Sequence, residues 1–198
     1  IIGGTGDLLD HLEEQDFVTF TGSASTALKL KSHPNIMAKS IPFNAEADSL
    51  NSAIMAPDVS PEDEEFEIFA KEVVKEMTAK AGQKCTAIRR ILVPAEHLDA
   101  LANTLKSRLA NIVVGDPHEE GVRMGALSSR DQLRDVNHAI EQLLETSECV
   151  FGREGSFKPV GQGVENGAFI TPHLLINRNP LNDGGAHDIE AFGPVATL

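Results

Sequence analysis

The sequence contains no tryptophan and no tyrosine, and its nine aromatic residues are all phenylalanine. This composition therefore does not favour a protein that binds single-stranded nucleic acid by stacking the bases on aromatic side chains. Basic residues are also scarce, with 17 against 30 acidic ones, and the resulting formal charge of −13 repels nucleic-acid phosphates and anionic lipid surfaces. We predict neither a nucleic-acid partner nor a membrane partner.

Long apolar runs are missing too. No segment approaches the roughly 18 apolar residues of a membrane-spanning helix, and the amino end lacks a basic stretch followed by an apolar one, which predicts a cytoplasmic protein. Cys85 and Cys149 are too few for a disulfide framework and lack the paired spacing of a zinc site. The seven histidines are scattered, and no Gly-x-Ser-x-Gly motif is present. We predict no metal site and no serine-hydrolase site.

The remaining pattern alternates strands with helices. This rhythm favours a parallel, doubly wound α/β sheet, because each parallel strand pair needs a crossover. The chain starts without methionine and stops within a strand-like segment, which predicts a piece of a longer protein. We expect strands at 17–21, 36–43, 52–55, 86–93, 169–170, 174–176 and 191–198, and helices at 7–14, 24–32, 61–81, 97–112 and 129–144.

The strongest helix signal follows Val59. Ser60 is a suitable cap, Pro61 suits the first helical position, and the four acidic residues 62–65 complement the positive end of the helix dipole. The acidic, proline-bearing stretch at 59–62 also separates two parts of the chain that are each rich in strand-helix units. We therefore predict two domains, 1–59 and 60–198.

Two glycine-containing turns, Gly4-Thr5-Gly6 and Gly22-Ser23, each lie between a strand and a helix. Backbone N–H groups at such a place can bind a phosphate. A turn that simply requires glycine gives the same pattern, and on these residues alone it is the favoured interpretation.

Cys85 lies in a polar turn just past Gly82, between a helix and a strand, where a thiol is accessible to a substrate. The alternative is a buried structural thiol, which is commoner for a single cysteine and which we predict for Cys149. Glu46 follows a predicted strand, so its carboxylate would face the crevice at the carboxyl edge of the sheet. A solvated loop acid is the alternative, and Asp48 is a competing carboxylate at the same edge.

Six short segments, taken in order, resemble the aldehyde dehydrogenase superfamily over nearly the whole chain. They are residues 1–6, 18–23, 82–85, 114–117, 125–127 and 190–194. One short motif proves little, whereas six in the family's order are specific. The resemblance implies an α/β chain: 1–59 would be the last part of a Rossmann-like cofactor domain, and 60–198 most of the catalytic domain with its parallel sheet.

Residues 41–51 and 80–90 are similar to one branch of the family, the dehydrogenase part of bifunctional bacterial enzymes of phenylacetate breakdown. Those enzymes open an oxepin-CoA ring and oxidise the semialdehyde that results. The similarity implies that the substrate is a small-molecule aldehyde linked to CoA. It also implies NADP as the cofactor, with NAD as the alternative, and a homo-oligomeric parent enzyme.

By the same resemblance, Cys85 is the nucleophile. Its thiolate would attack the aldehyde carbon, and after hydride transfer to the nicotinamide a thioester would remain on the sulfur. Glu46 would activate the water that hydrolyses this thioester. The backbone N–H of Cys85 would supply one donor to the developing oxyanion.

The cofactor contacts are likewise implied by the resemblance. Gly22 and Ser23 would lie at the pyrophosphate, Glu190 would hydrogen-bond the nicotinamide ribose, and Phe192 would pack beside the ring. The family's oxyanion asparagine, and its lysine and glutamate for the adenine ribose, lie upstream of Ile1. We therefore expect the 198 residues alone to show little or no dehydrogenase activity.

One departure from the family and two rival functions remain open. Residues 47–49 are Ala-Asp-Ser where the family usually has glycines, so the path of the loop after Glu46 is not fixed by the resemblance. The first rival is an acylating dehydrogenase that passes the thioester to CoA and needs no general base. The second is an inactive dehydrogenase-like domain that serves binding or assembly.

Overall fold

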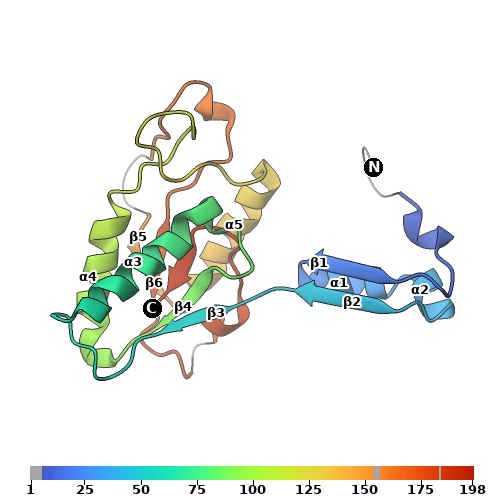
Figure 1. Ribbon diagram of the computed structural model, residues 1–198, viewed down its shortest axis with the longest axis horizontal. Coiled ribbons are helices and arrows are strands. Elements are labelled where there is room, and N and C mark those ends of the chain that lie inside the picture. The colour runs from blue at the N-terminus through green and yellow to red at the C-terminus, as the bar shows by residue number, and fades with distance from the viewer. Residues whose placement is uncertain (1–5, 154–156, 183) are drawn as a thin grey trace. The chain divides into compact units, whose positions relative to one another are not determined.

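The computed structural model describes residues 6–153, 157–182 and 184–198, and its contacts divide the chain into two compact units, Ile1–Ser49 and Leu50–Leu198 (Figure 1). Strands in both units are joined by helices and pair mostly in parallel, which confirms the predicted α/β class. The first glycine turn falls almost entirely outside the described residues. The assignment of 1–59 and 60–198 to two functional domains stays a prediction.

The first unit is a two-stranded parallel sheet with its crossover. Strands β1 (Val18–Gly22) and β2 (Phe43–Ala47) pair so that Thr21 lies opposite Glu46. Helix α1 (Ala24–Lys31) is capped by Ser23, whose hydroxyl accepts a 3.3 Å hydrogen bond from the backbone N–H of Thr26. The predicted strand at 17–21 and helix at 24–32 are confirmed to within one residue. The expected helix at 7–14 is reduced to one 3₁₀ turn, η1 (Leu8–His11).

The predicted strand at 36–43 is wrong. Its first half is a short helix, α2 (Pro34–Ala38), and strand β2 begins only at its last residue. Pro34 occupies the first turn of α2, and the ring of His33 accepts from the Asn35 backbone N–H. The Asn35 amide in turn donates to the carbonyls of Leu9 and Leu12, which attaches α2 to the segment around η1.

The second unit is built on a five-stranded sheet with the order β3-β4-β7-β6-β5. All neighbours are parallel except β5 and β6, and the antiparallel edge strand β5 was not predicted. In chain order the elements are β3 (Asn51–Ile54), α3 (Glu64–Thr78), η2 (Ala79–Gly82), β4 (Ile88–Leu92), η3 (Ala95–His97), α4 (Leu98–Leu109), α5 (Arg130–Leu143), β5 (Glu148–Phe151), η4 (Val164–Asn166), β6 (His173–Ile176), α6 (Gly185–Asp188) and β7 (Val195–Thr197).

Hydrophobic clusters cover both faces of this sheet. Adjacent residues of β6 point to opposite faces, so Leu174 joins the cluster that includes residues of α3 and α4, while Leu175 joins the cluster that includes residues of α5. Both leucines are fully buried. Central strands of parallel sheets are buried on both sides, which accounts for the continuous apolar run that ends β6.

The helix caps agree with the sequence in one case and differ in another. The hydroxyl of Ser129 accepts from the backbone N–H of Gln132 at 3.0 Å and begins α5, as predicted. Helix α3 instead begins at Glu64, because the Asp63 carboxylate accepts hydrogen bonds from the N–H and hydroxyl of Ser60 and holds that segment in a turn. In the described parts of the chain, every helix is too short or too polar to cross a bilayer.

Candidate active site

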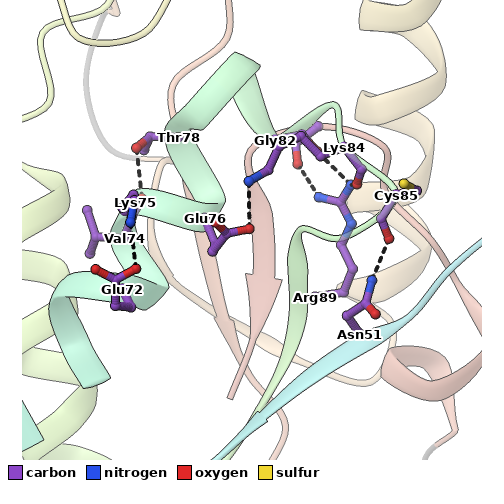
Figure 2. Close-up of polar contacts among 11 residues, drawn as sticks. Asn51, Glu72, Val74, Lys75, Glu76, Thr78, Gly82, Lys84, Cys85 and Arg89 are labelled. Carbon is purple, nitrogen blue, oxygen red and sulfur yellow. Dashed lines mark hydrogen bonds and ion pairs between the residues drawn. The ribbon is translucent and has the colours of Figure 1, made fainter. Parts of the chain in front are cut away.

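Cys85 lies exposed in the turn that joins η2 to β4, as the sequence predicted for an accessible thiol (Figure 2). Cys149 lies within β5, half-buried, and its thiol donates to the carbonyl oxygen of Phe151 at 3.3 Å. The two cysteines therefore differ in solvent access, and only Cys85 presents its sulfur on a surface turn.

The backbone before Cys85 is left-handed for three successive residues. Lys80, Ala81 and Gly82 have φ of 54°, 52° and 69°. Each non-glycine residue in this region costs about 1 kcal/mol or more, so the surrounding structure must hold the turn in place. A Cβ atom on Gly82 would lie 2.1 Å from the Gly193 carbonyl oxygen, so only glycine fits there. We call residues 80–85 the nucleophile turn, after the role that the sequence predicts for Cys85.

Side chains from other elements fix the nucleophile turn. The Lys84 ammonium forms a 2.7 Å ion pair with Glu76 of α3, and both groups are largely shielded from solvent (Figure 2). The side-chain amide oxygen of Gln83 accepts from the backbone N–H of Ser128 at 2.9 Å, and the side-chain amide nitrogen donates to the Lys80 backbone carbonyl. The turn is thus attached to α3 on one side and to the segment before α5 on the other.

The strand β3 contributes a further contact. Asn51, at the start of β3, donates from its amide nitrogen to the backbone carbonyl of Cys85 (Figure 2). This bond acts on the main chain of Cys85 itself rather than on a neighbouring residue.

The two residues that the resemblance assigns to the nicotinamide lie near the same buried side chain, Arg89 of β4. The Glu190 carboxylate, 13% exposed, lies 3.9 Å from the Arg89 Nε, and the Arg89 guanidinium lies 5.6 Å from the centre of the Phe192 ring. Burial lowers the pKa of Arg89, and the negative charge of Glu190 opposes that shift. Glu190 and Phe192 therefore belong to one small cluster.

The first unit brings Gly22, Ser23 and Glu46 to one edge of its sheet. Because β1 and β2 are parallel, their carboxyl ends coincide, and the exposed Glu46 lies beside the turn that starts α1. Glu46 is the fourth residue of β2, not a residue that follows the strand. The competing acid Asp48 is bound locally, because its carboxylate accepts from the Ala24 N–H at 3.0 Å.

The site residues therefore fall into two groups. Cys85, Glu190 and Phe192 lie in the second unit, whereas Gly22, Ser23 and Glu46 lie in the first. The convergence of Cys85 and Glu46 on one crevice stays a prediction. Among the described residues, no three histidine, cysteine, aspartate or glutamate side chains gather as metal ligands.

Sequence reasoning missed Arg89 and Asn51. The signal for Arg89 was present, because Arg89 and Arg90 stand among the apolar residues of a predicted strand, and a buried arginine is costly unless its guanidinium is paired. Asn51 carried no such signal, since an asparagine at a strand end is ordinary.

Comparison with known proteins identifies the family. Residues 3–198 match the model of the aldehyde dehydrogenase family, so the chain belongs to that family. It is 48% identical over all 198 residues to a 3,4-dehydroadipyl-CoA semialdehyde dehydrogenase from Aromatoleum evansii, and 30% identical over 196 residues to a putative aldehyde dehydrogenase from Staphylococcus haemolyticus. The alignments cover 100% and 98% of this chain and 38% of each relative, so the chain spans a little over a third of their length.

Solved structures agree on the fold. A betaine aldehyde dehydrogenase double mutant from Staphylococcus aureus, in complex with NAD+, has a TM-score of 0.80 at 24% identity and is matched over 97% of this chain and 36% of its own. An aldehyde dehydrogenase mutant from Pseudomonas syringae with NAD+ and octanal has a TM-score of 0.77 at 24% identity, over 92% of this chain and 35% of its own.

Proposed function

We propose that the chain carries the nucleophile and the general base of an NAD(P)-dependent aldehyde dehydrogenase that oxidises a CoA-linked semialdehyde to the carboxylic acid. The observation that carries this proposal is Cys85, an exposed cysteine at the end of a turn with left-handed residues. Contacts from β3, from α3, from the segment before α5 and from Arg89 of β4, which donates to the Gly82 carbonyl, hold this turn in place. Family membership supplies the class of reaction.

The proposed chemistry uses the chain's residues in sequence. The Cys85 thiolate adds to the aldehyde carbon, and the backbone N–H of Cys85 donates to the oxyanion that forms. When bound, the nicotinamide cofactor accepts the hydride, which leaves a thioester on the sulfur. Glu46 then takes a proton from water, the hydroxide attacks the thioester carbonyl, and the acid departs as the thiol is restored.

The residues present suit two parts of a nicotinamide cofactor, its pyrophosphate and its nicotinamide ribose and ring. Gly22 and Ser23 stand at the carboxyl end of a parallel strand and at the start of α1, a place suited to a pyrophosphate. Glu190 offers a carboxylate to a ribose hydroxyl, and the Phe192 ring is 36% exposed. We propose NADP as the preferred cofactor on the branch resemblance, with NAD as the alternative.

The substrate class rests on the relative that is 48% identical, whose name gives a CoA-linked semialdehyde. We propose a substrate of this kind from aromatic breakdown, and phenylacetate breakdown in particular on the resemblance of residues 41–51 and 80–90. The test is NADPH formation by the natural full-length protein from a CoA-linked semialdehyde, compared with the same aldehyde lacking CoA. Equal kcat/KM for the two aldehydes would reject the CoA-linked assignment.

Two substitutions test the roles of the site residues. Cys85→Ala should lower turnover by on the order of 10³-fold or more, whereas the matched control Cys149→Ala should stay near wild type. Glu46→Gln should leave the first NADPH burst and slow steady-state turnover about 100-fold as an acyl-enzyme accumulates. Asp48→Asn is the control for Glu46, and an unchanged steady state in Glu46→Gln would remove Glu46 from the mechanism.

The rival functions give different results in the same assays. An acylating dehydrogenase would form product only when CoA is added, whereas the proposed hydrolytic enzyme forms the acid without it. An inactive binding domain would give no NADPH at all. In that case an inert thiol at Cys85 would also react slowly with iodoacetamide at neutral pH.

A further inference from the structure

We propose that Arg89 is a positioning residue of this dehydrogenase, holding the nucleophile turn and the Glu190–Gly193 segment in one fixed relation. The inference rests on the proposed function. It concerns a residue that touches neither substrate nor reacting atoms and that acts through the backbone of the two segments that do.

The guanidinium bridges the two segments directly. Its Nη1 donates to the Gly193 carbonyl at 2.6 Å. Its Nη2 donates to the Gly82 carbonyl at 2.6 Å and to the Lys84 carbonyl at 3.4 Å (Figure 2). Gly82 and Gly193 are 111 residues apart in the sequence, and a single side chain holds both. Arg89 therefore connects the nucleophile turn to the Glu190–Gly193 segment, which contains Phe192.

The approach of the two backbones makes this bridge necessary. The Gly82 Cα lies so near the Gly193 carbonyl that a Cβ would be 2.1 Å from its oxygen. The carbonyls of Gly82 and Gly193 both accept from the same buried guanidinium, and a buried carbonyl that lost its donor would be costly. Arg89 is only 4% exposed, so its charge is expensive to bury without these acceptors and the Glu190 carboxylate.

Lysine cannot replace this arrangement. A guanidinium has a planar fork of N–H donors that reaches two separate carbonyls at once, whereas an ammonium on a flexible stem is a point charge. Arg89→Lys thus preserves the positive charge and removes the fork. If the fork sets the distance between the Cys85-bound aldehyde and the nicotinamide, hydride transfer must suffer more than aldehyde binding.

The test uses the natural full-length protein and a matched control on the same strand. Arg90 is the next residue of β4, and its guanidinium donates to the Leu50 carbonyl at 2.5 Å and contacts the His187 ring at 3.3 Å. Among the described residues, neither of these two contacts involves the nucleophile turn. Arg90→Lys therefore makes the same replacement on the same strand, at a half-buried position, without removing a donor to the nucleophile turn.

Three quantities are measured for each variant: the rate constant of the first NAD(P)H burst, the KM for the aldehyde, and the rate of iodoacetamide labelling at Cys149. Cys149 lies in β5, far along the sheet order from β4, and its protection reports that the second unit is folded. We expect Arg89→Lys to lower the burst rate constant about tenfold or more, with Cys149 labelling unchanged and KM altered far less. Arg90→Lys should retain a burst near wild type.

A second variant perturbs the bridge from its other end. A Cβ on Gly193 would lie 2.8 Å from two Val136 methyl carbons, so Gly193→Ala displaces the carbonyl that Arg89 holds. The same burst loss with protected Cys149 is expected. A burst rate constant within about twofold of wild type in a folded Arg89→Lys variant overturns the proposal. Loss of Cys149 protection in both variants also overturns it, because Arg89 would then serve only to stabilise the fold.

Failure of the proposed function gives a different result. A wild-type protein that forms no NAD(P)H burst with any aldehyde rejects the dehydrogenase itself. A wild-type burst that Arg89→Lys leaves intact rejects only the positioning role.

Discussion

The side-chain amide of Asn51 donates a 2.5 Å hydrogen bond to the backbone carbonyl of Cys85, 34 residues further along the chain. Asn51 begins the edge strand β3, whose register places it beside Ile88, three residues after Cys85. The edge strand β3 therefore contacts the main chain of Cys85 directly, in addition to the contact that α3 makes with Lys84.

This contact predicts a selective effect of Asn51→Asp. The substitution removes the donor and places a carboxylate oxygen against a carbonyl oxygen, so the nucleophile turn should shift and the free energy of unfolding should fall by about 1 kcal/mol. Asn111→Asp is the matched control, because the Asn111 amide donates to the Ser107 carbonyl at 2.8 Å, away from the site.

Urea unfolding and iodoacetamide labelling of Cys85 measure the two consequences. Both variants should lose comparable stability, whereas only Asn51→Asp should change the labelling rate of Cys85. Identical labelling in the two variants would show that the Asn51 contact does not set the position of the sulfur.

Gly82 is predicted to be intolerant of a side chain. Gly82→Ala combines a left-handed φ of 69° with a Cβ 2.1 Å from the Gly193 oxygen, so we expect a loss of about 2–4 kcal/mol in unfolding free energy. Gly121→Ala isolates the backbone part, because Gly121 has a φ of 84° and nothing within 4 Å of an added Cβ. That control should cost about 1 kcal/mol, and equal losses measured by urea unfolding would contradict the steric argument.

The buried His173 leads to a prediction of how the free energy of unfolding depends on pH. Burial on β6 lowers the pKa of His173 from its ordinary value of 6.5, although the ring also contacts the Thr171 carbonyl at 2.9 Å, which opposes the shift. Below pH 6.5 the unfolded chain binds the proton more readily than the folded one. The contribution of neutral His173 to the free energy of unfolding is therefore complete above pH 6.5. It is lost as the pH falls through the lowered pKa of His173 in the folded state.

The measurement is the urea midpoint between about pH 8 and pH 5. His173→Gln should flatten the loss of stability on acidification, whereas substitution of the exposed His138 by glutamine should leave the slope near wild type. A wild-type slope in His173→Gln would assign the acid sensitivity to other groups.

Local sequence determined several elements of the fold. Ser23 and Ser129 each cap the helix that the pattern predicted, because a cap needs only a hydroxyl and the N–H group two or three residues on. The order of the short motifs also identified the aldehyde dehydrogenase family, which the family match confirmed. Such signals depend on residues close together in the chain, so they can be read without a structure.

The tertiary structure decided the rest. The predicted strand at 36–43 failed because Asn35 makes its hydrogen bonds to carbonyls more than 20 residues earlier, and these contacts favour a helix there. Lys80 and Ala81 are left-handed against their own preference, since distant groups outweigh local propensity. Arg89 can act as proposed only when folding brings the Gly82 and Gly193 carbonyls to its guanidinium. Local sequence patterns cannot predict this contact, because the two glycines are far apart in the sequence.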